Sequence, residues 1–331
     1  MAKLGFNPFE RLQFSGDLCF LSGEKLSSSE ESIPVFPLWL MQKFSLEDVP
    51  FKLLDESMST YRQLRVPCSA RVFEGSVNPL EETIRAAFES GYSAVVQLDP
   101  LVLFQWISKL LYGMLYNEIR IGIRQQHALG EEFSFSQALR HKFMNLHYML
   151  QSLISPVVFE DPKPWTIRVF PVTNAPETFN YRDEINTLAF SLRMNDFGII
   201  ACLQDNGVNG IYHREVLDRV GSEPLHPIQF EELSARFFYT AYLFNRLPEY
   251  TYLPTDEAVY IEPMPLKGIS NKPLFDFWQN KTYAQVLENF WKPWGYTLFE
   301  ILKDPENPKS FLAGPEGQFP GAASVDLPVK P

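Results

Sequence analysis

The stretch IPVFPLWL (residues 33–40) lies between two segments that each contain one cysteine, CFLSGEKL (residues 19–26) and VPCSARVFEGSVNPLEETI (residues 66–84). None of the side chains in the central stretch is charged, and none can accept a proton in catalysis. Its Pro37, Trp39 and Leu40 are residues that pack in a core. The order and spacing of the three segments therefore indicate the fold of this region better than any one of them.

A helix is well signalled over residues 78–91, NPLEETIRAAFESG. Asn78 can cap its start, and Pro79 suits the first helical position. The acidic side chains that follow complement the positive end of the helix dipole. Gly91 can end the helix in a left-handed turn. We expect this helix to be one of the best-defined elements of the chain.

In this order, the three segments resemble a family of bacterial HNH-type, treble-clef nuclease-like proteins, which includes uncharacterised members. In that family the first segment is a C-x-x-C knuckle, the second reads E-H-x-I-P-x-W-L, and the third is C-x-x-C-N shortly before a helix. The resemblance covers residues 19 to about 90 and implies a small treble-clef-like module. In the intact motif, four thiolates bind a structural zinc. The histidine activates a water beside a divalent ion at a phosphodiester.

The chemical positions of this motif are substituted here. Aligned on the W-L pair, Pro34 takes the histidine position and Ile33 the glutamate position, and Val72 stands where asparagine is expected. Proline cannot act as a base, two thiols do not complete a four-ligand site, and an arginine repels a cation. The resemblance therefore implies a degenerate site with no catalytic residue, no bound metal and no cofactor. The degenerate ligand positions are Cys19, Ser22, Cys68 and Arg71.

Composition bounds the compartment and the partners. Hydrophobic residues make up 45% of the chain and charged residues 21%, which is typical of a soluble globular protein. The chain starts without the apolar segment of a secretory signal, and its three cysteines are too few for a disulfide framework, so we expect a cytoplasmic protein. No apolar run approaches the roughly 18 residues of a membrane span. The net charge of −11, without a dense basic run, argues against nucleic acid as a partner.

The rest of the chain alternates helix and strand signals. Asp99 can cap one helix, and Ser134 with Gln137 fits a capping box for the next. Asn195 and Asp196 form a tight turn between two strands. Helices are expected over residues 98–120, 134–155 and 228–247, and strands over residues 165–172 and within 186–207.

The expected fold class is α+β. A small treble-clef-like N-terminal module without zinc (residues 1–92) packs on a helical and mixed-sheet body (residues 93–312), followed by a loose tail (residues 313–331). Without a metal, so small a module lacks its main source of stability. We therefore expect it to dock against the helices after Asp99 and to form one composite domain with the body.

Other candidate chemistry is sparse. His141 and His147 lie six residues apart on one helix, about 240° around its axis, so they cannot share a metal ion. His147 is near the apolar stripe and is expected to be a hydrogen-bonded core residue. Asp196 and Asp205 could be paired carboxylates, but turn chemistry already accounts for both.

Aromatic residues concentrate near the end of the chain. Such a cluster could form a partner or ligand surface, since aromatic residues dominate binding hot spots. It could equally form a satellite core under long loops, which is the interpretation we favour. The cluster contains Trp278, Trp291, Trp294, Tyr296 and Phe299.

Two hypotheses for function remain open. The first is a non-enzymatic binding or interaction protein on a degenerate HNH-like scaffold, with a protein or small-ligand partner and unknown binding residues. The alternative is a divergent nuclease or other hydrolase whose site is assembled from residues 160–250. Retained HNH nuclease activity is disfavoured because each of its chemical positions is substituted.

Overall fold

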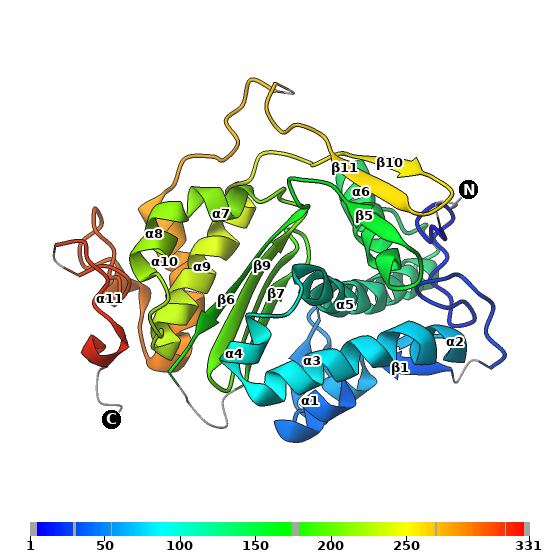
Figure 1. Ribbon diagram of the computed structural model, residues 1–331, viewed down its shortest axis with the longest axis horizontal. Coiled ribbons are helices and arrows are strands. Elements are labelled where there is room, and N and C mark those ends of the chain that lie inside the picture. Colours follow the sequence, from blue (N-terminus) through cyan, green and yellow to red (C-terminus); the bar gives the residue numbers. More distant parts are fainter. Residues whose placement is uncertain are drawn as a thin grey trace. The chain divides into compact units, whose positions relative to one another are not determined.

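The computed structural model describes residues 5–28, 31–53, 55–173, 179–268, 270–314 and 316–327. It contains helices and several small sheets, so the predicted α+β class is confirmed (Figure 1). Contacts divide the chain into two units. The first draws on residues 1–89, 98–163 and 247–264, and the second on residues 90–97, 164–246 and 265–331. The boundaries expected at residues 92 and 312 stay predictions.

Two short strand pairs open the first unit. Strand β1 (Ser32–Pro34) pairs antiparallel with β4 (Arg65–Pro67), and Ile33 lies opposite Val66. Between them the chain forms helix α1 (Leu38–Lys43) and the hairpin of β2 (Pro50–Lys52) with β3 (Met58–Thr60). The pairing of β1 with β4 therefore brings together two segments that are far apart in the sequence.

The helix after β4 starts earlier than the sequence suggested. Ser69 caps α2 (Ala70–Val72), which continues through the π-helical turn Phe73–Val77 into α3 (Asn78–Ser90). Asn78 is thus inside the helix, and its predicted role as the cap is wrong. Because Pro79 has no N–H, the regular hydrogen-bond ladder must be interrupted at this point. The wider π-helical turn directly before it is where the ladder changes.

Two long helices form the body of the first unit. Helix α5 (Pro100–Ala128) is capped as predicted, since the Asp99 side chain accepts a hydrogen bond from the backbone N–H of Leu101. Helix α6 (Gln137–Leu150) is capped by Ser136, two residues after the predicted Ser134. Within the described part of the chain, no helix is both long and apolar enough to cross a membrane.

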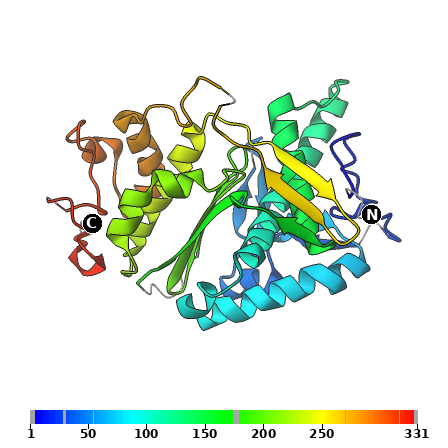
Figure 2. The ribbon, with the colours of Figure 1, turned by 45° about the horizontal axis from the view of Figure 1, so that its top comes forward.

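A three-stranded sheet completes the first unit. Strand β11 (Val259–Pro263) lies between β10 (Tyr250–Pro254), which is antiparallel to it, and β5 (Val157–Phe159), which is parallel to it. Figure 2 shows these three strands beside each other. The hydroxyl of Tyr252 in β10 donates to Oδ1 of Asn145 in α6 at 2.9 Å, which fixes this sheet to the helices.

The second unit is built on a four-stranded antiparallel sheet. Its strand order is β6 (Trp165–Pro171), β9 (Phe197–Leu203), β8 (Ala189–Met194) and β7 (Asn180–Glu184). The predicted turn at Asn195 and Asp196 joins β8 to β9, and Asn195 adopts the positive φ of 50° that such a turn requires. Asp196 also accepts a hydrogen bond from the backbone N–H of Tyr92, which begins α4 (Tyr92–Val95).

Helix α9 (Pro227–Leu243) is buried on two sides. One side packs on β6, β8 and β9, and the other on α10 (Asn280–Trp291) (Figure 1). It ends at Leu243 rather than near the predicted residue 247, because Phe244 leaves the helix and bridges to Phe275. The remaining helices of this unit are α7 (Val208–Tyr212), α8 (Arg214–Val220) and α11 (Leu298–Ile301).

The last described residues are anchored in the second unit. Phe319, Val325 and Leu327 are partly buried against the two cores of α9. The Gln229 side chain donates hydrogen bonds to the backbone oxygens of Phe311 and Gly321, at 2.9 and 3.2 Å. This part of the predicted tail (residues 313–331) therefore has fixed contacts, while residues 315 and 328–331 lie outside the described residues.

Candidate functional site

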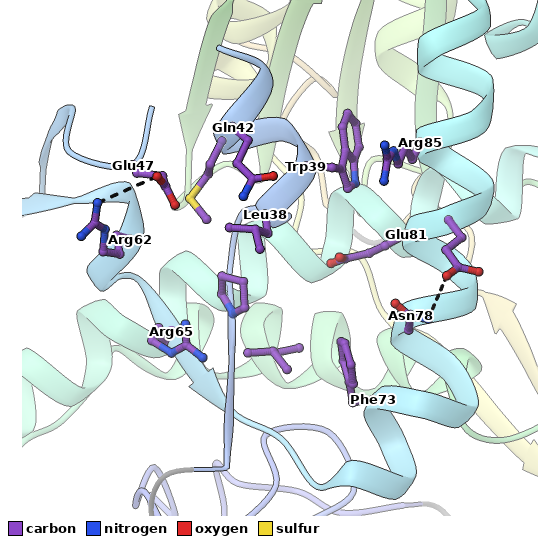
Figure 3. Close-up of a pocket in the computed structure, with 14 residues that line it drawn as sticks. Leu38, Trp39, Gln42, Glu47, Arg62, Arg65, Phe73, Asn78, Glu81 and Arg85 are labelled. Atoms are coloured by element: carbon purple, nitrogen blue, oxygen red, sulfur yellow. Dashed lines mark hydrogen bonds and ion pairs between the residues drawn. The ribbon is translucent and has the colours of Figure 1, made fainter. Parts of the chain in front are cut away.

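A pocket of about 500 Å³ lies in the first unit, between α1, the β1–β4 pair and α3 (Figure 3). This size accommodates a small organic ligand. Both residues that the resemblance places at the lost catalytic positions, Ile33 and Pro34, line it. The other lining residues are Leu38, Trp39, Met41, Gln42, Glu47, Arg62, Arg65, Phe73, Asn78, Glu81, Glu82 and Arg85.

The strand pair and helix α1 position the side chains that line the pocket. Antiparallel pairing of β1 with β4 places Pro34 opposite Arg65. Helix α1 contributes one apolar wall with Leu38 and Trp39, and Trp39 packs edge-on against Phe88 of α3 with ring centroids 6.2 Å apart. The indole N–H of Trp39 is buried and has no hydrogen-bond partner among the described residues. The pocket thus combines apolar walls with charged side chains.

A buried ion pair supports the α3 side of the pocket. Lys109 of α5 is 1% exposed, and its ammonium group donates to the carboxylate of Glu81 and, at 2.8 Å, to the backbone oxygen of Val35. These bonds connect α5 to both α3 and the segment between β1 and α1. The negative charge of Glu81 is therefore neutralised by the buried ammonium group of Lys109.

The other charges of the pocket fall into two groups. Arg62 pairs with Asp48 at 2.9 Å, and Arg85 pairs with Glu89 at 2.8 Å. Within the part of the chain that the structure describes, Arg65 instead donates to the hydroxyl and backbone oxygens of Ser32, which are neutral. Glu82 accepts a hydrogen bond from the Asn78 amide at 3.1 Å. Among the described residues, neither Arg65 nor Glu82 belongs to an ion pair.

The degenerate ligand positions lie close together, next to β1 and β4. A tight turn contains Cys19 and Ser22, closed by hydrogen bonds from the backbone N–H of Cys19 to the Glu24 oxygen and from that of Gly23 to the Cys19 oxygen. Cys19 and Cys68 are both buried free thiols. The hydrogen bond with Cys19, followed by burial and by the charge of Cys19, raises the pKa of Cys68.

The remaining ligand position carries a different interaction. Arg71 donates from Nε and Nη2 to Oε2 of Glu24, and the Ser69 hydroxyl donates to the same oxygen at 3.1 Å. The turn after Cys19 is therefore linked to the start of α2. In the described part of the chain, no three His, Cys, Asp or Glu side chains are placed to hold a metal ion.

The predicted core role of His147 is confirmed. Its side chain is fully buried, and Nε2 lies 2.9 Å from the backbone oxygen of Phe20. Because that bond requires a proton on Nε2, Nδ1 is free to accept from the Gln151 amide, 3.1 Å away. Burial lowers the pKa of His147 to about 4. The imidazole is therefore a neutral structural group.

The two aspartates singled out by sequence are explained by turns. Asp205 is buried and accepts hydrogen bonds from Thr166, from the backbone of Gly207, and from both the backbone and the side chain of Asn209. Burial raises its pKa, while these donors oppose the shift. Asp196 binds the start of α4 instead. Each carboxylate thus has its own structural role.

The aromatic cluster near the end of the chain is mostly core, as favoured. Trp291 and Tyr296 are buried, and Trp278 and Trp294 pack against the same core. Phe299 differs, because 82% of its surface is exposed.

The second unit contains a buried polar cluster around Glu231, which was not anticipated from the sequence. Glu231 of α9 is buried and accepts hydrogen bonds from Asn180, Arg193 and the indole of Trp294. Burial raises the pKa of Glu231 despite these donors. His226, which caps α9, lies 5.6 Å from the Trp294 ring, and burial followed by the charge of Arg193 lowers its pKa. Sequence spacing gave no signal here because the partners come from three separate elements.

Comparison with known proteins identifies no relative of this chain. No protein-family model, no curated protein and no solved structure matches the chain. Function is therefore inferred from the geometry of the pocket and of the polar cluster around Glu231.

Proposed function

We propose that this chain is a non-enzymatic binding protein on a degenerate HNH-like, treble-clef scaffold, and that the pocket beside Pro34 holds its ligand. The observation that carries the proposal is the position of the pocket. Its wall contains Ile33 and Pro34, which the resemblance aligns with the catalytic pair of the HNH motif. A binding site has thus kept the place of an active site whose reactive groups are gone.

The order of elements supports the scaffold. A knuckle-like turn at Cys19 is followed by an antiparallel strand pair and then by a helix, which is the order of a treble clef. The two strands are separated by residues 35–64, which contain α1 and the β2–β3 hairpin. This segment supplies Leu38 and Trp39, which form an apolar wall of the pocket.

The chemistry of the pocket supports binding over hydrolysis. Catalysis by a metal-bound or general-base-activated water needs a ligand set or a poised base. In the pocket, Pro34 offers neither, and Glu81 is bound to Lys109. The three free thiols fit a reducing compartment, so we place the protein in the cytoplasm.

The direct test is an assay with supercoiled plasmid DNA and with structured RNA, with Mg²⁺ and with Mn²⁺. The proposal predicts no cleavage above buffer at any protein concentration. Cleavage that rises in proportion to the protein, and that is lost in Pro34→Gly or Glu82→Gln, would overturn it.

A hydrolase with its site in the second unit is the second candidate, supported by the cluster around Glu231. A carboxyl group whose pKa is raised by burial is suited to act as a general acid. The test is a panel of nitrophenyl esters, phosphates and glycosides, with Glu231→Gln and, as the control, the exposed Glu215→Gln. Turnover lost only in Glu231→Gln would support this candidate, and a panel without turnover would remove it.

A further inference from the structure

Two charged side chains of the pocket, Arg65 and Glu82, have no ion-pair partner among the described residues, and they indicate which kind of ligand the pocket binds. Arg65, on β4, is largely exposed, and its Nε and Nη2 groups are used by Ser32, which leaves Nη1 without a hydrogen bond among the described residues. Glu82, on α3, is also exposed and receives one hydrogen bond, from Asn78. A guanidinium and a carboxylate are thus both available to a bound molecule.

These groups stand on different sides of the pocket. In Figure 3, Arg65 lies on one side and Asn78, the hydrogen-bond partner of Glu82, on the other, with Leu38 and Phe73 between the two sides. Ile33 and Pro34 add to this apolar middle. The two charges that have no ion-pair partner among the described residues therefore lie at opposite ends of the pocket, with an apolar centre between them.

We propose that the pocket binds a small zwitterion whose carboxylate pairs with Arg65, whose apolar body lies over Pro34 and Leu38, and whose ammonium group pairs with Glu82. This inference rests on the proposed binding function. A molecule with only one charge would leave either Arg65 or Glu82 without a counter-charge beside an apolar body. A phosphate dianion could pair with Arg65 but would leave Glu82 without a cationic partner, whereas a zwitterion supplies a counter-charge to both side chains.

The test is isothermal titration calorimetry with straight-chain acids that carry a terminal amino group: aminohexanoate, aminooctanoate and aminododecanoate. The series varies the distance between the two charges while keeping their chemistry. Octanoate and octylamine each keep the same body and one charge. The inference predicts that one zwitterion binds roughly tenfold more tightly than either single-charge compound, as expected for one added charged hydrogen bond.

Two variants assign the ends. Arg65→Gln should abolish the preference for aminooctanoate over octylamine, and Glu82→Gln should abolish its preference over octanoate. Both side chains are exposed, so the fold should persist, which the melting temperature checks. Lys52→Gln, an exposed change outside the pocket, should leave every affinity unchanged.

Failure of this inference can be separated from failure of the proposed function. Equal binding of the zwitterions and the single-charge compounds, no binding of any of them, or a preference that survives both variants would overturn the inference. These binding results are independent of whether the protein cleaves nucleic acid. Cleavage in the plasmid and RNA assay would instead overturn the binding function on which the inference rests.

Discussion

Arg71 donates two hydrogen bonds to one carboxylate oxygen of Glu24, from Nε at 3.3 Å and from Nη2 at 3.2 Å. This pair closes the turn after Cys19 onto α2, where the resemblance places a zinc ligand. Both side chains are well exposed, 66% for Arg71 and 43% for Glu24. Such pairs contribute about 1 kcal/mol or less, whereas a structural zinc contributes about 10 kcal/mol or more.

Burial rather than this ion pair holds the turn in place. Cys19, Phe20 and Leu21 are at most 1% exposed. The Phe20 ring stacks on Tyr112 of α5, and its backbone oxygen accepts a hydrogen bond from His147 of α6. The helices of the first unit therefore hold this turn in place by packing and by a hydrogen bond.

The first prediction compares these two contributions. Phe20→Ala should lower the free energy of unfolding by about 3–5 kcal/mol, because it removes a fully buried aromatic ring and leaves a cavity. Arg71→Ala should lower it by about 1 kcal/mol or less. Urea denaturation followed by tryptophan fluorescence measures both. If Arg71→Ala proves as damaging as Phe20→Ala, the turn depends on the ion pair and not on packing.

The second prediction concerns the buried ion pair behind the pocket. Lys109→Met should lower the free energy of unfolding by about 3 kcal/mol, because Glu81 keeps its charge without its partner. Adding Glu81→Gln to this variant should restore part of the loss, since no unpaired charge remains. Lys52→Met, in an exposed pair with Glu56, is the matched control and should have little effect. Equal losses in the single and double variants would contradict the role assigned to Glu81.

The third prediction is a pH dependence that arises from His147. Burial lowers its pKa from the usual 6.5 to about 4 in the folded protein. Between these pH values the unfolded chain binds a proton that the folded chain does not. The contribution of neutral His147 to the free energy of unfolding is therefore fully present above pH 6.5 and is lost as the pH falls towards 4. The loss from this residue is about 3 kcal/mol.

His147→Gln should remove that part of the pH dependence, although the variant is less stable at neutral pH. His127→Gln, at an exposed position in the last turn of α5, is the control for the substitution of a histidine by glutamine. Urea midpoints between pH 4 and 7.5 decide the matter. His213, another buried histidine whose pKa is lowered, remains in both variants, so some dependence persists. An identical slope in the native chain and His147→Gln would refute the assignment.

The fourth prediction tests the packing of α9 on the sheet. A Cβ at Gly198 would lie 2.2 Å from the ring of Phe230, so Gly198→Ala should cost about 1–3 kcal/mol of stability through overpacking. A Cβ at Gly75 would meet no described atom within 4 Å. Because Gly75 lies in a helical segment, Gly75→Ala should increase the stability of the protein slightly. Thermal unfolding of the two variants should therefore shift in opposite directions. A stable Gly198→Ala protein would mean that α9 does not press on β9.

Local signals predicted much of the fold. The capping of α5 by Asp99 and the turn at Asn195 and Asp196 depend on neighbouring residues alone, and both are confirmed. The start of the helix containing Asn78 was misplaced because Pro79 resembles a first helical residue. The helix in fact continues through a π-helical turn, for which the sequence has no distinct pattern.

The candidate site was harder to predict. Pro34 and Arg65 come together only through the pairing of β1 with β4, which have no recognisable turn between them. The charge state of the pocket depends on Lys109, which arrives from α5 and whose burial no local pattern indicates. Long-range contacts of this kind are set by tertiary packing, so the residues that line the pocket could not be read from their sequence neighbourhood.

The proposal at the centre of this interpretation is that the degenerate ligand positions bind no zinc and that packing holds this part of the chain together. The most direct measurement is the zinc content, by elemental analysis, of the native chain and of the double variant Ser22→Cys with Arg71→Cys, both purified with zinc present. The account predicts no stoichiometric zinc in the native chain and stoichiometric zinc in the variant, in which all four ligand positions carry thiols. Stoichiometric zinc bound to the native chain at Cys19 and Cys68 would contradict it.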